Sequence, residues 1–328
     1  TASENTAVGY QASGNNTTGL QNVAIGHNTA RLTTTGRENT TVGKGAMYYN
    51  TTGSYNTSLG KEALQNNTTA SYNTAVGYQA GYSNTTGTEN VAIGANALDA
   101  NTTGSANVAV GQGSLDNNTT GLQNTAVGHD SMKLNTTGRE NAALGKGSLN
   151  ANTEGDYNTA LGRSALVANT TASNNTAVGY QALYDNTTAE RNTAVGRLAA
   201  ANTTTGADNT AMGSAALTTN TTGANNIAIG ASALRLNTTA DYNTAVGFEA
   251  LYNQTTAQGG YNTAVGYRAG YTGNGYYNTH IGYTAGNIST GYRGTFIGHG
   301  AGNSITTGNG NTIIGTYNGN SVGLDIST

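Results

Sequence analysis

The sequence contains no cysteine, no proline and no tryptophan among its 328 residues, and only two phenylalanines and three methionines. The lack of cysteine excludes disulfide bonds and thiolate metal sites. So few large apolar side chains cannot fill a single globular core of the usual kind. Charged residues make up 9% of the chain and the formal net charge is −3, which argues against a nucleic-acid-binding surface. No stretch approaches the roughly 20 apolar residues of a membrane span.

Asn, Thr, Gly and Ala are abundant instead, and they are arranged as a tandem repeat. The string "NTAVGYQA" stands at residues 5–12, 73–80 and 175–182. Its opening Asn recurs with a constant 17-residue period from Asn5 to Asn243, and more loosely spaced copies follow, so that the chain holds 19 in all. Longer matches, such as "GLQN" at 19–22 and 121–124, recur six copies later. A fixed period of this kind indicates a solenoid or another repeat array.

The copies can be compared with one another when the opening Asn is numbered repeat position 0. Position 4 is Gly in every copy, and position 3 is Val, Ile, Leu or Met in every copy. Position 2 is mostly Ala, position 7 is Ala or Ser in nearly all copies, and position 8 is commonly Leu or Met. Positions 12 and 13 read Thr-Thr in 14 of the first 15 copies.

These positions predict one coil of a β-solenoid per repeat. "NTAVG" predicts a short strand that ends in a turn, positions 7–9 a second strand-like piece, and "NTTG" a polar corner. Burial of the position 3 and position 8 side chains contributes roughly 1.5–3 kcal/mol each, whereas ordering each residue costs about 1–2 kcal/mol. A coil is therefore stable only in a stack. We expect an all-β, parallel β-solenoid or β-roll of 17-residue coils, assembled as a parallel homotrimer because a single roll has so thin a core.

The invariant residues have structural explanations in such a stack. We expect the opening Asn to form a stacked amide ladder, represented by Asn22, Asn73, Asn124 and Asn175. We expect the invariant Gly to occupy a corner with positive φ or close backbone approach, represented by Gly9, Gly77, Gly128 and Gly179.

The spacing of the repeats becomes irregular near the end of the chain. We expect residues 1–259 to form the regular array, built from duplicated six-copy blocks, and residues 260–328 to form irregular terminal coils that act as a cap or transition. Bulky residues enter position 2 there, namely His280, Phe296 and Ile313. A cluster of tyrosines marks this end as a candidate binding surface, which consists of Tyr261, Tyr267, Tyr271, Tyr276, Tyr277, Tyr283 and Tyr292.

Three strings carry a resemblance to a known family. "NTAVGYQA", "NVAIGANA" and "NIAIGASA" are similar to the head repeats of trimeric autotransporter adhesins, the YadA-type left-handed parallel β-roll. Longer matches resemble repeats in phage tail fibres and bacterial surface fibre proteins. The resemblance covers essentially the whole chain, although the repeat of adhesin heads is commonly shorter than the one found here. It implies a self-associating fibre that is extracellular, on a cell surface or on a virion, with a cell-surface glycan or receptor as partner.

The function that we expect is a structural and adhesive fibre shaft, a spacer or attachment rod of a tail fibre, surface adhesin or extracellular filament. The alternative is an ice-binding β-solenoid that uses its Thr ladders, although adjacent Thr residues point to opposite faces. A glycan-processing fibre would need paired carboxylates, which the sequence does not offer. We expect no enzyme activity, catalytic residue, cofactor or metal site, because the four His lack ligand spacing and the calcium-binding nonapeptide is absent.

Two further expectations concern processing. The "NTT" strings at Asn50, Asn67, Asn84, Asn101 and elsewhere match the glycosylation sequon, but turn chemistry explains their regularity better. The chain begins at Thr1 without Met or a signal peptide, so we expect it to be a segment of a longer protein.

Overall fold

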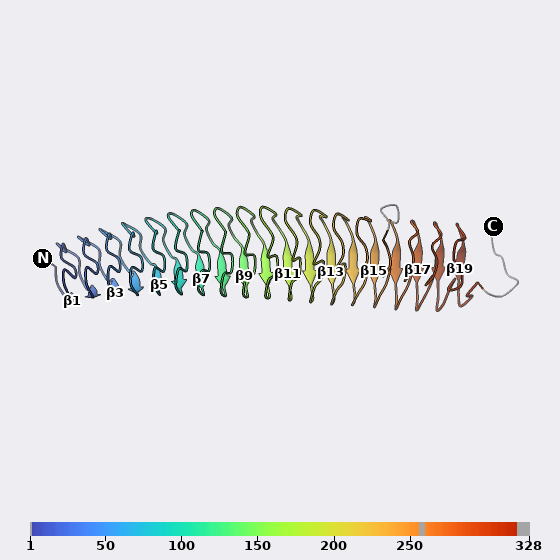
Figure 1. Cartoon of the computed structure of the whole chain (residues 1–328), viewed down its shortest axis with the longest axis horizontal. Coiled ribbons are helices and arrows are strands. Elements are labelled where there is room, and N and C mark those ends of the chain that lie inside the picture. Colours follow the sequence, from blue (N-terminus) through green and yellow to red (C-terminus); the bar gives the residue numbers. More distant parts are fainter. Residues whose placement is uncertain (1, 256–259, 320–328) are drawn as a thin grey trace. The chain divides into compact units, whose positions relative to one another are not determined.

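The structure is a computed structural model that describes residues 2–255 and 260–319. The chain divides into two compact units, Thr1–Ser164 and Ala165–Thr328, and each is described by itself. Both consist of three-residue parallel strands joined by turns, and the described residues include no helix (Figure 1). The expected all-β, parallel β-solenoid of 17-residue coils is confirmed.

Every coil contributes one strand, which covers repeat positions 1–3. The strands of the first unit are β1 (Thr6–Val8), β2 (Val23–Ile25), β3 (Thr40–Val42), β4 (Thr57–Leu59), β5 (Thr74–Val76), β6 (Val91–Ile93), β7 (Val108–Val110), β8 (Thr125–Val127), β9 (Ala142–Leu144) and β10 (Thr159–Leu161). Those of the second unit are β11 (Thr176–Val178), β12 (Thr193–Val195), β13 (Thr210–Met212), β14 (Ile227–Ile229), β15 (Thr244–Val246), β16 (Thr263–Val265), β17 (Thr279–Ile281), β18 (Thr295–Ile297) and β19 (Thr312–Ile314).

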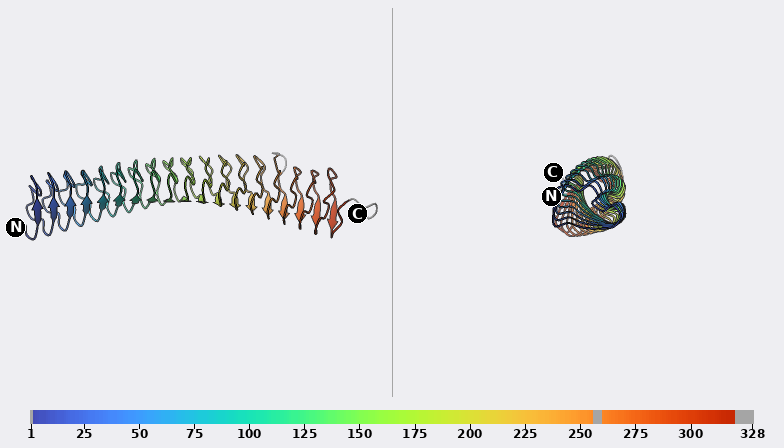
Figure 2. Two further views of the ribbon diagram at one scale, coloured as in Figure 1. Left: turned by 60° about the horizontal axis from the view of Figure 1, so that its bottom comes forward. Right: turned by 90° about the vertical axis from the view of Figure 1, so that its left-hand side faces the viewer.

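Within each unit, successive strands lie side by side (Figure 2). They pair in parallel and in register, so that like repeat positions are opposite each other. In the first unit, for example, Ala75 of β5 lies opposite Ala92 of β6. The strands stay in register where the spacing between two repeats of the second unit is 19 residues, since Ala245 of β15 lies opposite Ala264 of β16. The extra residues are therefore accommodated outside the strand.

In residues 2–255 and 260–319, the segment at positions 7–9 turns and does not form the second strand-like piece that we expected. Positions 6 and 8 adopt left-handed backbone conformations, as at Asn96 (φ 55°) and Leu98 (φ 56°), which extended strands do not allow. Neighbouring coils still exchange backbone hydrogen bonds there, such as Leu98 N–H to Ser114 C=O at 2.9 Å and Ala100 N–H to Asp116 C=O at 2.9 Å. Each coil is consequently bonded to the next on its turn side as well as on its strand side.

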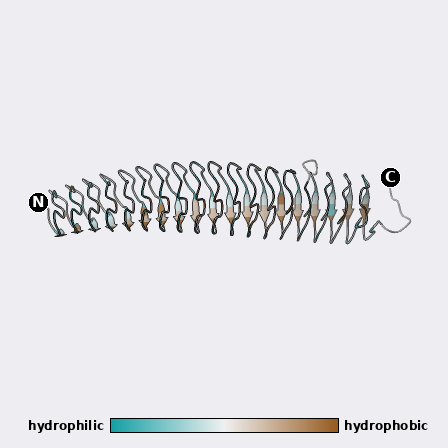
Figure 3. Cartoon of the chain, in the orientation of Figure 1, coloured by the Kyte–Doolittle hydropathy of each residue, from teal (hydrophilic) through white to brown (hydrophobic). Residues whose placement is uncertain are grey.

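The core of a coil is a narrow column of small side chains around one larger one. Ala at position 2, Ala or Ser at position 7 and Leu or Met at position 8 are buried, as are Ala92, Ala97 and Leu98 in the β6 coil. Figure 3 shows apolar colouring in several of the strands. Burial of the position 8 side chain agrees with the sequence prediction and contributes about 1.5–3 kcal/mol per coil.

The last described coils exchange large and small residues within this column. His280 and Phe296 occupy position 2, fully buried, and glycine replaces Leu at position 8 in Gly270, Gly286 and Gly302. A Cβ atom added to Gly270 would lie 2.8 Å from the His280 ring, and one added to Gly286 would lie 3.0 Å from the Phe296 ring. β17, which contains His280, is teal between apolar neighbours in Figure 3.

Candidate functional site

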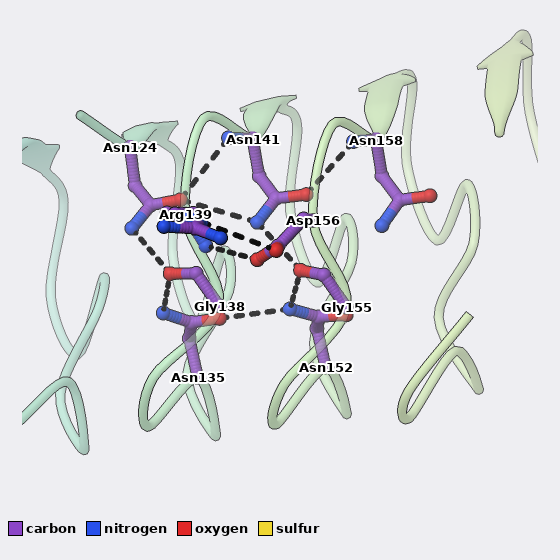
Figure 4. A network of polar contacts seen from close by, with 9 residues as sticks. All are labelled: Asn124, Asn135, Gly138, Arg139, Asn141, Asn152, Gly155, Asp156 and Asn158. Atoms are coloured by element: carbon purple, nitrogen blue, oxygen red, sulfur yellow. Dashed lines mark hydrogen bonds and ion pairs between the residues drawn. The ribbon is translucent and has the colours of Figure 1, made fainter. Parts of the chain in front are cut away.

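The opening Asn residues are buried and link each coil to the next, but mainly through the backbone. Asn141 N–H donates to Asn124 Oδ1 at 3.1 Å, and Asn158 N–H donates to Asn141 Oδ1 at 2.8 Å (Figure 4). Asn22, Asn73 and Asn175 accept the same bond from the Asn of the following coil. In the regular 17-residue coils, Nδ2 commonly donates to the position 14 carbonyl of the same coil, as from Asn124 to Gly138 at 2.8 Å. The Asn side chain thus fixes both the coil shape and the stacking.

A second column of buried Asn lies at position 11, where turn chemistry alone was expected. Asn152 Nδ2 donates to Asn135 Oδ1 at 2.8 Å, and Asn135 Nδ2 donates to Gly138 C=O at 2.9 Å. The amide ladder that we expected at position 0 is present in several coils, since Asn39 Nδ2 donates to Asn22 Oδ1 at 3.1 Å and Asn141 Nδ2 donates to Asn124 Oδ1 at 3.2 Å. Position 11 provides a second amide ladder. In the sequence, the recurrence of Asn before Thr-Thr indicates this column, but the same pattern is also typical of a turn.

The hydrogen bonds of position 11 also affect whether the "NTT" sequons can carry a glycan. The side chains of Asn50, Asn67 and Asn101 have no exposed surface, and Asn84 is 1% exposed. Their Nδ2 atoms donate to the position 14 carbonyl of the same coil, as Asn67 does to Ala70 at 3.0 Å. An oligosaccharide on these amides would break the ladder, so turn and ladder chemistry accounts for the repeated "NTT".

The invariant Gly occupies a corner that has both a positive φ and a close backbone approach. The φ values are +128° at Gly9, +140° at Gly77, +134° at Gly128 and +134° at Gly179. A Cβ atom on Gly128 would lie 2.6 Å from the Gly145 carbonyl oxygen of the next coil, and one on Gly179 would lie 2.5 Å from that of Gly196. Any other residue would strain the backbone and separate the coils.

The side chains at positions 1 and 3 point outward, and together they form what we term the strand face. We expected position 3 to be buried with position 8, and that prediction is wrong. Leu59 is 47% exposed, Ile93 39% and Leu144 49% in the first unit, and Met212 is 43% exposed in the second. The alternation of a strand requires this result, because position 2 points into the coil. Position 3 is thus apolar in every copy although it faces out, and no copy places a charge at positions 1 or 3.

The two Thr-Thr positions differ in their contacts, although they lie in a bend and not in a strand. Position 12 hydroxyls donate to the backbone of the next coil, as Thr85 Oγ1 does to Thr102 C=O at 2.9 Å. Position 13 side chains are exposed, as at Thr86, Thr103 and Thr120. Of the two adjacent positions, only position 13 presents its Thr side chain outward, and in the ninth copy Glu154 replaces it.

The candidate tyrosine surface is brought together on the second unit as rows of stacked rings. Tyr261 stacks on Tyr277 with centroids 5.1 Å apart, Tyr267 on Tyr283 at 5.1 Å, and Tyr276 on Tyr292 at 5.0 Å. Tyr271 stacks on Tyr252 at 5.1 Å. Stacking occupies ring faces, so these rows present mainly ring edges and hydroxyl groups to solvent.

Arg268 joins this surface between two of the rows. Its guanidinium lies 5.3 Å from the Tyr267 centroid and 5.1 Å from the Tyr271 centroid, and it is paired with Glu249 at 2.6 Å. Its hydrogen bond to Glu249 raises the pKa of Arg268. The positive charge is therefore already matched within the protein, which disfavours a strong anion site here.

Three carboxylates that affect one another lie in neighbouring coils of the first unit, at Asp99, Asp116 and Asp130. Burial, and secondarily the neighbouring Asp116 carboxylate, raises the pKa of Asp99 to about 6. Burial also raises the pKa of Asp116, whereas Lys133 lowers it and Asp130 raises it. No group of three or more His, Asp or Glu suited to a metal ion occurs among residues 2–255 and 260–319.

The four histidines have different surroundings. His27 stacks on Tyr10 at 5.2 Å, His129 pairs with Asp130 at 2.9 Å, and His299 stacks on Tyr283 at 5.0 Å. His280 is buried, and neither ring nitrogen has a hydrogen-bond partner. Its burial lowers its pKa to about 4, so that it is neutral at pH 7.

Comparison with protein-family models and with curated proteins found no match to this sequence. In the described part of the chain, no helix has the length and apolar character that crossing a membrane requires.

Proposed function

We propose that this chain is a structural and adhesive fibre shaft that associates with copies of itself, as a parallel homotrimer, through its strand face. The observation that carries the proposal is the outward position 3 side chain, which is apolar in all 19 copies and is either exposed or half-buried in each. A solvated position would be expected to accept polar residues in some copies. Extended apolar surface of this kind is typical of interaction sites.

A second copy of the chain suits this face better than an unrelated partner. Residue type repeats at every coil, so a parallel copy presents a matching row of Thr and Val or Ile at the same spacing. Symmetric assembly then requires one patch to be complementary to itself or to its neighbour in a ring. Charges, in contrast, lie beside the strands, as in the Arg139–Asp156 pair at 3.3 Å and the Arg191–Asp208 pair at 2.7 Å.

The environment and adhesive role follow from the family resemblance of the repeats. Such shafts are extracellular, on a cell surface or on a virion, and we assign the same setting to this chain. The tyrosine rows of the second unit are the surface that we propose for contact with a cell-surface glycan or receptor, through hydroxyl groups and ring edges. The chain needs no catalytic group or cofactor for this role.

The second candidate is ice binding, and the exposed rank of Thr at position 13 is the observation that favours it. The position 12 hydroxyls donate to the neighbouring coil, whereas the other outward Thr residues lie at position 1 of the strand face. Thermal hysteresis of the purified protein would support this candidate, and its absence would remove it.

Native mass determination tests the self-association. We expect a trimer for the wild-type chain, and a monomer or weakened trimer for Ile93→Lys, which places a charge on the strand face. Thr103→Lys adds the same charge to the exposed Thr rank of the same coil, and it should leave the mass unchanged. A monomeric wild-type chain at micromolar concentration would refute the proposed assembly.

A further inference from the structure

The stacked tyrosines come from neighbouring coils, which gives their side chains almost identical placement. In the first unit, Tyr55 stacks on Tyr72 with centroids 4.9 Å apart and an interplanar angle of 3°. In the second unit, Tyr242 stacks on Tyr261 at 4.9 Å and 12°. The pairs Tyr267–Tyr283 and Tyr276–Tyr292 have interplanar angles of 9° and 3°. The ring of one coil therefore lies over the equivalent ring of the next.

These rings are also open to solvent. Tyr55 is 37% exposed, Tyr72 59%, Tyr261 53% and Tyr283 51%. An oxidant can reach the phenols, and the two partners of each pair are held together by the in-register backbone. Reactions between groups fixed side by side gain effective concentrations of about 10⁵ M or more over the same groups in free solution.

We propose that the stacked tyrosine pairs are sites of oxidative cross-linking, at which dityrosine bonds join successive coils. The co-reactant is hydrogen peroxide used by a haem peroxidase. Each of two phenols gives up one electron and one proton, and the peroxide is reduced to two waters. The two phenoxyl radicals combine through ring carbons next to the oxygen, since Cβ occupies the opposite carbon. The hydrogens on those carbons then move to the oxygens, which restores both phenols.

Stacking favours this step for a geometrical reason. The new carbon–carbon bond forms from the face of each ring, and stacked rings present their faces to each other. The exposed side chains can close the gap of about 5 Å by small rotations about χ1 and χ2. An edge-to-face pair lacks this arrangement even when its rings are as close. Tyr48 and Tyr49 form such a pair, with centroids 4.7 Å apart and an angle of 68°.

A dityrosine bond between coils would tie together elements that are otherwise held by hydrogen bonds and packing alone. A coil could then not separate from its neighbour without breaking a covalent bond. This property would benefit any exposed shaft, but the inference does not depend on the proposed function, because the bonds form within one chain.

Treatment of the folded 328-residue chain at high dilution with hydrogen peroxide and a haem peroxidase tests the inference. We expect dityrosine fluorescence, a mass loss of two hydrogen atoms for each bond, and cross-linked peptides that join Tyr55 to Tyr72, Tyr242 to Tyr261, Tyr267 to Tyr283 and Tyr276 to Tyr292. The yield at each stacked pair should exceed that at Tyr48–Tyr49 by about tenfold or more.

Conservative variants provide the controls. Tyr72→Phe retains a stacked ring but should abolish the Tyr55 cross-link, whereas Tyr49→Phe should leave every stacked-pair product in place. Tyr10, which stacks on His27, should yield no dityrosine within the chain. Absence of cross-links in the folded chain, equal yields at Tyr48–Tyr49, or the same products from the urea-unfolded chain would each overturn the inference.

Discussion

Asn186 and Thr203 occupy position 11 of neighbouring coils, and the amide ladder is interrupted between them. Asn186 Nδ2 donates to Asn169 Oδ1 at 2.9 Å, as elsewhere in the column. On its other side, Asn186 Oδ1 and Thr203 Oγ1 are both buried without a hydrogen-bond partner. The Thr hydroxyl is too short to replace the amide that other coils place at this point.

The substitution Thr203→Asn should therefore stabilise the second unit. The new amide can donate to Asn186 Oδ1 and to the position 14 carbonyl at Gly206, so two unsatisfied buried atoms are removed. We expect a gain of about 1–2 kcal/mol in the free energy of unfolding, measured by urea denaturation. Thr205→Asn makes the same change at an exposed site of the same coil and should have little effect. Equal effects of the two variants would argue against ladder repair.

Replacing either of two glycines in one coil should reduce the free energy of unfolding by very different amounts. Gly145 has φ +134°, and an added Cβ would lie 2.7 Å from the Gly162 carbonyl carbon and oxygen. Gly147 has φ +63°, and its added Cβ would meet only the Ser164 hydroxyl, at 4.0 Å. Gly145→Ala should destabilise the first unit by about 3 kcal/mol or more, since strain and a backbone clash combine. Gly147→Ala should cost about 1 kcal/mol, because other copies place non-glycine residues there. Thermal or urea unfolding compares the pair, and similar losses would contradict this account.

His280 should make the stability of the second unit depend on pH. Its folded-state pKa of about 4 lies below the unfolded value near 6.5. The unfolded chain therefore binds a proton between these values that the folded chain excludes, and stability falls as pH decreases from about 6.5 to 4. The stability at pH 4 should be lower than that at pH 7 by up to about 3 kcal/mol.

His280→Phe isolates this effect, because it keeps a ring that can stack on Phe296, now 5.4 Å away. The variant should lose most of the decrease between pH 6.5 and 4. His299→Phe changes an exposed histidine and should retain it. A decrease that persists unchanged in His280→Phe would assign the acid sensitivity to other groups.

Asp99 should make the first unit less stable as pH rises, which is the opposite of the effect of His280 on the second unit. Its folded-state pKa of about 6 exceeds the unfolded value near 4, so its favourable contribution is present below pH 4 and is lost as pH rises through 6. Asp99→Asn should therefore stabilise the first unit at pH 7 by roughly 1 kcal/mol, allowing for solvent screening. The two proteins should converge near pH 4. A constant difference across this range would show that packing, rather than charge, is responsible.

Comparison of the repeat copies predicted the strand, the corner glycine and the burial of position 8. The assignments of position 3 and position 11 required the structure. Position 3 is apolar, and apolar character normally indicates the core, but the strand alternation places it on the face opposite Ala92 and its equivalents. The turn preference of Asn at position 11 explains its hydrogen bond within the coil. It does not explain the second hydrogen bond, which joins this Asn to the equivalent Asn of the neighbouring coil.

The sequence by itself determined the coil, because its period and the Gly and Asn at fixed positions permit little else than stacked turns in register. Only the tertiary structure decided which side chains face inward. A three-residue strand has two faces of similar composition, Ala on one and Thr with Val on the other, and the left-handed turn at positions 6 and 8 selects the face it folds over. The direction of that turn depends on contacts between coils, such as Leu98 N–H with Ser114 C=O, that no single repeat contains.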